Sequence, residues 1–153
     1  MSHADYNGVT QSRLNTSSIR KMLTRNFALA EFIKPEETTT FKRHPMQVLY
    51  ESRLALVAFA LQQVRDELGM PLVITSGWRS KERNVRIGGS PTSDHPSGWA
   101  ADVKCPFISA DKLAACFVSA EKRGLIKFDQ LIIYPWHVHV SVNPRFRGQV
   151  FNR

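Results

Sequence analysis

The sequence predicts a single α/β domain of the α+β type, in which helices flank a small, mainly antiparallel sheet. Residues 45–68 carry apolar side chains at three- and four-residue spacing, which is the pattern of an amphipathic helix. Later stretches are short and rich in β-branched and aromatic residues, which is typical of strands. With 153 residues, 42% of them hydrophobic, the chain can bury one ordinary core, so we expect one domain.

Two parts of unequal size are expected along the chain. Residues 1–25 are rich in Ser, Thr and Asn and predict a flexible or loosely docked leader. Residues 26–153 form the predicted domain, which begins with a short apolar patch at 26–33. Residues 35–40 are interpreted as a loop. The long helix of residues 45–68 is then expected to end at Gly69.

The elements after this helix follow from local patterns. Ser109 is a suitable N-cap, so a helix is expected to begin there and to end near Gly124. Pro135 separates the last two strands and indicates a tight turn. The polar stretch 81–93 is interpreted as a loop. The expected strands are residues 71–75, 99–103, 128–134 and 136–142.

Charge and composition limit the function classes. The net charge of +8 favours a polyanionic partner, but the basic residues are scattered and no nucleic-acid-binding motif accompanies them. We therefore expect no nucleic acid partner, and an anionic cell wall satisfies the same electrostatics. There is no apolar run of about 18 residues, so no membrane span is expected.

Export and redox state are also addressed by the sequence. Residues 1–24 contain no apolar segment of the kind found in secretory signal peptides, so we expect synthesis in a bacterial cytoplasm. Cys105 and Cys116 show no Cys-x-x-Cys spacing. They are therefore predicted to be reduced thiols.

Two separated segments carry side chains that bind metals. Residues 93–102 contain His95 and Asp102, and residues 136–139 contain His137 and His139. Two imidazoles and one carboxylate, with a fourth position open for water, are what a catalytic zinc site requires. His137 and His139 are two apart on an expected strand, so they face the same side. A lone His-x-His pair is a common accident, but its combination with the first segment indicates a metal site.

These residues resemble the signature of the M15 zinc peptidases. The family includes D-alanyl-D-alanine carboxypeptidases, D,D-dipeptidases and phage endolysins that cut peptidoglycan stem peptides. Residues 75–80 resemble its arginine-bearing turn and residues 128–132 its penultimate strand. The resemblance covers about residues 26–142 and implies an M15/hedgehog-like zinc peptidase fold. The matching positions are Ser93, His95, Gly98, Ala100, Asp102 and, further along, His139.

The resemblance also implies roles for individual residues. His95, Asp102 and His139 would bind Zn²⁺, which activates a water as the nucleophile. Arg79 would bind the substrate carboxylate or stabilise the developing oxyanion, because it has a permanent charge and planar donors.

The general base is where this sequence departs from many family members. They carry a Glu or Asp three residues before the last zinc ligand, where this chain has Trp136. Other members use a histidine two residues before that ligand, and His137 fits this variant. Asp129 is the reserve candidate.

The expected function is zinc-dependent hydrolysis of peptidoglycan stem peptides, of the D,D-carboxypeptidase or L,D-endopeptidase type. A phage-encoded lysin or virion-associated protein is expected. It would reach the cell wall through a lysis pore or as part of a virion, and phage structural proteins are candidate partners. Two alternatives stay open. One is a non-catalytic cell-wall-binding or structural virion module that retains the fold. The other is an iron(II) oxygenase, since two histidines and a carboxylate also form that facial triad.

Overall fold

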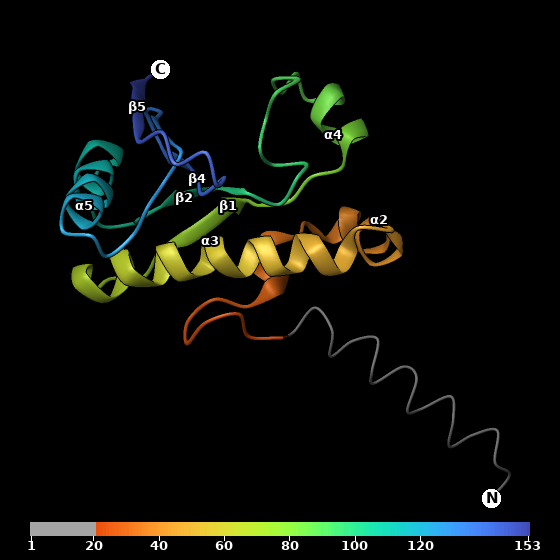
Figure 1. Ribbon diagram of the computed structural model, residues 1–153, viewed down its shortest axis with the longest axis horizontal. Coiled ribbons are helices and arrows are strands. Elements are labelled where there is room, and N and C mark those ends of the chain that lie inside the picture. Colours follow the sequence, from red (N-terminus) through yellow and green to blue (C-terminus); the bar gives the residue numbers. More distant parts are fainter. Residues whose placement is uncertain (1–20) are drawn as a thin grey trace, which may run out of the picture.

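The computed structural model describes residues 21–153 and confirms the predicted α+β fold (Figure 1). Most of the predicted leader, residues 1–20, lies outside the described residues. Within the described part, five strands form one sheet in the order β1-β2-β4-β3-β5. All neighbouring strands are antiparallel except β3 and β5, which are parallel. The strands are β1 (Val73–Ser76), β2 (Ala100–Lys104), β3 (Gln130–Ile133), β4 (Val138–Ser141) and β5 (Gln149–Asn152).

The two main helices are those that the sequence predicts. The long α3 (Gln47–Leu68) ends at Gly69, whose φ of 62° is the left-handed conformation common at helix C-termini. The helix α5 (Ala110–Lys122) begins after Ser109, whose side chain accepts a hydrogen bond from the Lys112 amide at 3.3 Å. None of the helices within residues 21–153 has the length and apolarity needed to cross a membrane. Cys105 and Cys116 are both free.

Five short elements were not predicted, and one of them is the strand β5. Residues 35–40 form a 3₁₀ turn, η2 (Pro35–Glu37), and the start of α2 (Thr38–Arg43), instead of a loop. Another 3₁₀ turn, η1 (Leu29–Phe32), lies in the apolar patch. The stretch 81–93, also predicted as a loop, begins with α4 (Lys81–Arg86). The start of α4 is anchored by a long-range contact, because Glu37 accepts two hydrogen bonds from Ser80, both at 3.0 Å.

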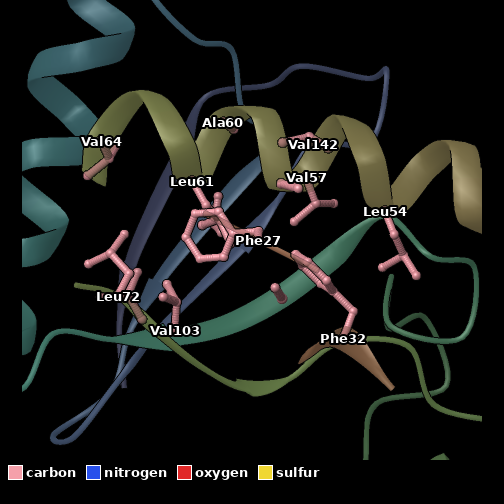
Figure 2. Close-up of a cluster of buried hydrophobic side chains, with 14 of the residues drawn as sticks. Phe27, Phe32, Leu54, Val57, Ala60, Leu61, Val64, Leu72, Val103 and Val142 are labelled. Atoms are coloured by element: carbon pink, nitrogen blue, oxygen red, sulfur yellow. The ribbon is translucent and has the colours of Figure 1, made fainter. Parts of the chain in front are cut away.

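The core lies between α3 and one face of the sheet (Figure 2). The buried side of α3 contributes Leu54, Val57, Leu61 and Val64, which pack with Phe27, Phe32, Leu72 and Val103. The helix α5 covers β3 and β4. The helices α3 and α5 thus cover one face of the sheet, and the opposite face of its central strands is available for polar side chains.

Gly77 occupies a point where two chain segments touch. The Trp78 amide donates to the Phe32 carbonyl at 2.8 Å, and a Cβ on Gly77 would lie 2.4 Å from that carbonyl oxygen. Backbone atoms cannot move aside cheaply, so Gly77→Ala is expected to lower the free energy of unfolding by about 2–3 kcal/mol. Urea denaturation would measure the loss.

Gly124→Ala provides the control. Its Cβ would have open space, so only its φ of 76° would cost free energy, about 1 kcal/mol. Equal losses in the two variants would contradict the steric explanation for Gly77.

Candidate active site

The register of the sheet places two of the predicted metal ligands side by side. Asp102 on β2 lies directly opposite His139 on β4. Directly paired residues project from the same face of a sheet, so both side chains point away from the core. His95 reaches them from the loop that precedes β2. Gly98 turns this loop into the strand with a φ of 80°, a conformation that glycine adopts without strain.

The three side chains meet in a small cluster. His95 Nε2 lies 3.2 Å from Asp102 Oδ1 and 3.2 Å from His139 Nδ1, and the latter lies 2.9 Å from Asp102 Oδ1. On the other side of its ring, His95 Nδ1 lies 2.7 Å from the Gly77 carbonyl. A carbonyl only accepts hydrogen bonds, so Nδ1 carries the proton and Nε2 presents its lone pair to the cluster.

This donor set fits a tetrahedral zinc ion. Ligand bonds of about 2.0–2.1 Å at tetrahedral angles place neighbouring donors about 3.3 Å apart. The three separations in the cluster, 2.9–3.2 Å, are close to that value. His95, Asp102 and His139 could therefore hold a metal ion.

The protonation states of His95 and Asp102 also favour metal binding. Burial lowers the pKa of His95, which keeps the ring neutral as a metal ligand requires. Burial alone would raise the pKa of Asp102. The hydrogen bond from His139 and the contact with the His95 ring outweigh that effect and hold the pKa of Asp102 well below its usual value. The centre thus presents an ionised carboxylate beside a neutral imidazole.

Arg79 and His137 flank this cluster. Arg79 Nη2 lies 3.7 Å from Asp102 Oδ2, and His137 Nε2 lies 3.9 Å from the same oxygen. The Arg79 guanidinium also donates to Asn84 and Ser76, both at 3.1 Å, so its orientation is fixed. Two of the predicted catalytic residues, Arg79 and His137, line one cleft of about 560 Å³ together with the three residues of the cluster.

The structure does not bring Asp129 to this cleft. Its side chain is fully buried and accepts two hydrogen bonds from the Arg147 guanidinium, both at 2.8 Å, and one from the Arg147 amide at 3.1 Å. Arg145 Nη2 lies 3.0 Å from the same carboxylate. Both oxygens are thus occupied by guanidinium groups. Trp136, which stands where many family members carry an acid, is 85% exposed.

Several cleft residues were missed by the sequence reasoning. Tyr134 stacks on the His137 ring, with centroids 4.6 Å apart and planes inclined by 13°. Gln130 and Ile132 line the same cleft. These three residues alternate along the predicted strand 128–134, so the period-two pattern was the signal that could have found them. Asn84, which orients Arg79, carried no comparable signal.

An ion-pair network fixes the loop that carries His95. Asp94, the neighbouring residue, accepts hydrogen bonds from Asn143 at 3.0 Å and from Arg145 at 2.9 Å. The same Arg145 nitrogen reaches Asp129, so one guanidinium links the His95 loop to the start of β3. Asp129 therefore has a structural role, because its carboxylate is part of the network that holds the His95 loop.

Asp129→Asn is expected to destabilise the protein by about 2–3 kcal/mol, because charged hydrogen bonds to a buried carboxylate are lost. The hydrogen bond from Arg147 lowers the pKa of Asp129. A carboxylate with a lowered folded pKa stabilises the fold above its ordinary pKa of about 3.9 and loses this effect as the pH falls through the folded value. The difference between wild type and variant should therefore be full at neutral pH and shrink below about pH 4. Urea unfolding across this pH range would measure it. A large loss of turnover in fully folded Asp129→Asn protein would instead restore Asp129 as a candidate base.

Comparison with known proteins extends over nearly the whole described chain. A family model described as Peptidase M15 matches residues 25–152. No curated protein matches the chain. The matched range includes the three residues of the cluster, Arg79 and His137, and it also includes β5.

Proposed function

The chain belongs to the peptidase M15 family, and we propose that it is a zinc-dependent peptidase that hydrolyses peptidoglycan stem peptides. The observation that carries the proposal is the convergence of His95, Asp102 and His139 at tetrahedral donor spacing inside a cleft. M15 peptidases are metallopeptidases, so this cluster could hold the metal ion that their reaction requires. The alternative of an iron(II) oxygenase is not favoured by membership of a peptidase family.

The proposed reaction divides the work between the metal and the side chains. When bound, zinc lowers the pKa of water and polarises the peptide carbonyl. Arg79 stabilises the negative charge that develops on the substrate oxygen or binds a substrate carboxylate. Its guanidinium is held ready for this by Asn84 and Ser76, so little reorganisation is needed during the reaction.

His137 is the proposed general base. Its Nε2 accepts a proton from the attacking water and returns it to the nitrogen of the leaving amine. Two features support this role, since the ring lines the cleft beside the cluster and stacks on Tyr134, which restricts its orientation. Asp129 is not proposed for this step, because its oxygens are occupied by Arg145 and Arg147.

The biological setting is also part of the proposal. Residues 26–153 form the peptidase domain and residues 1–25 a leader. The net charge of +8 favours attraction to an anionic wall. We place the activity at the bacterial cell wall, in a phage lysin released through a lysis pore or in a virion component.

The test is digestion of purified peptidoglycan sacculi, with and without a zinc chelator, followed by mass spectrometry of the soluble products. Defined peptide fragments that disappear with chelator and return on addition of zinc are expected, and their masses identify the bond that is cut. Zinc-loaded protein that releases nothing from walls of several chemotypes would contradict the proposal and favour the wall-binding alternative. Elemental analysis of the purified protein would distinguish zinc from iron.

A further inference from the structure

The cleft extends beyond the metal cluster to the end of β5. Phe151, Asn152 and Arg153 line it together with the cluster residues. The register explains this, because His139 lies opposite Ile132 on β3, and Ile132 lies opposite Phe151 on β5. The chain end at β5 and the helix α4 rise from the sheet on the same side, opposite to α3 (Figure 1).

Arg153 continues this surface by one step. It follows Phe151 by two residues, so it faces the same side of the sheet. Its amide donates to the Ile133 carbonyl at 2.9 Å, which continues the pairing of β5 with β3. His137, Tyr134 and Arg153 therefore lie side by side across neighbouring strands. They form a row of paired positions next to the row of His139, Ile132 and Phe151.

The two arginines of the cleft lie on opposite sides of the cluster. Arg79 follows β1, at one edge of the sheet, and Arg153 follows β5, at the other. Two strand spacings separate β4 from β5, which is about 10 Å. Arg79 is already bonded to neighbouring side chains, whereas within residues 21–153 no ion pair involves Arg153.

The acidic side chains of the cleft do not pair with the Arg153 guanidinium. Among its lining residues, the carboxylates are Asp94 and Asp102. Asp94 is neutralised by Arg145, and Asp102 belongs to the metal cluster. The β5 end of the cleft therefore presents a guanidinium that no carboxylate side chain of the cleft neutralises and that is available to a ligand.

We infer that Arg153 is a specificity-determining residue that binds a carboxylate of the substrate, on the side of the scissile bond away from Arg79. Each residue of an extended peptide spans about 3.3 Å, so the carboxylate belongs to a residue about three positions from that bond. The preferred substrate class is then a peptide with a free acid, and not an amide, at this position. The inference rests on the proposed function, because it places the scissile bond at the metal cluster.

The test uses a synthetic stem pentapeptide in three forms: with both carboxylates free, with the glutamyl carboxylate amidated, and with the C-terminal carboxylate amidated. Wild type, Arg153→Gln, Arg153→Lys and Arg43→Gln are compared, all zinc-loaded. Arg43 is an exposed arginine on α2, outside the cleft, so its variant removes the same charge elsewhere. Peptide affinity is measured by calorimetry in the His137→Gln background, and kcat/KM with His137 intact.

Arg153→Gln is expected to weaken binding and kcat/KM for the free peptide by about ten- to a hundred-fold, the range for a charged hydrogen bond. Amidation of one particular carboxylate should have the same effect on wild type and no further effect on Arg153→Gln. Arg153→Lys should retain part of the affinity and Arg43→Gln should match wild type.

The outcomes separate this inference from the proposed function. An Arg153-dependent preference for one carboxylate, without cleavage of any peptide, supports the subsite and contradicts the peptidase proposal. Cleavage with equal sensitivity to Arg153→Gln and Arg43→Gln, or without sensitivity to amidation, overturns the subsite and leaves the peptidase intact. Neither binding nor cleavage by wild type overturns both.

Discussion

Replacing His139 by alanine is expected to abolish peptidase activity and to weaken zinc binding by more than about 100-fold. Loss of a group that merely orients a metal ligand typically costs 10–100-fold in affinity, so loss of a ligand itself should exceed that range. The remaining His95 and Asp102 would offer two donors, too few for a catalytic zinc site. Titration against a chromophoric chelator would measure the affinity.

A second measurement reports on the same site without activity. Zinc that binds only the folded state raises the melting temperature by an amount that grows with the logarithm of its affinity. The rise should be present in wild type and absent in His139→Ala. His44→Ala is the matched control, because His44 packs on Tyr50 and Trp78 outside the cluster and its loss should leave the zinc-dependent rise unchanged. A His139→Ala protein that still melts higher with zinc would show that the ion is held elsewhere.

The metal cluster could be predicted because its ligands lie in two short segments of the sequence, each with a recognisable spacing. His95 and Asp102 lie within ten residues of each other around a glycine turn, and His139 alternates with His137 on a strand. The period-two geometry of strands then decides which side chains share a face. The long helix α3 was predictable for a similar reason, since its apolar spacing extends over six turns.

Elements that depend on distant contacts could not be predicted in this way. The strand β5 has only four residues and pairs in parallel with β3, so nothing in its own composition required a strand. The helix α4 depends on Glu37, more than forty residues away. Asp129 looked available in the sequence, but the structure pairs it with Arg145 and Arg147 from the segment before β5. A single sequence does not specify which charges meet across such distances.

His137→Gln is expected to lower kcat by about 10²–10⁴-fold, the usual contribution of a general base, while zinc binding stays at the wild-type level. The two effects separate because His137 Nε2 lies 3.9 Å from Asp102 Oδ2, beside the cluster and outside its three donors. Glutamine keeps a polar side chain of similar length at the cleft but cannot accept and return the proton. Single-turnover hydrolysis of a stem peptide, with zinc content measured on the same sample, would test both halves.

Tyr134 allows the role of His137 to be divided into proton transfer and orientation. Tyr134→Phe preserves the stacked ring, so kcat should stay within a few-fold of wild type, whereas Tyr134→Ala removes the support and should lower kcat by about 10-fold. In the His137→Gln background, Tyr134→Ala should have no further effect, because the group that it orients is already lost. Additive losses would mean that Tyr134 contacts the substrate itself. Near-normal turnover in His137→Gln with zinc bound would place the base on another side chain of the cleft.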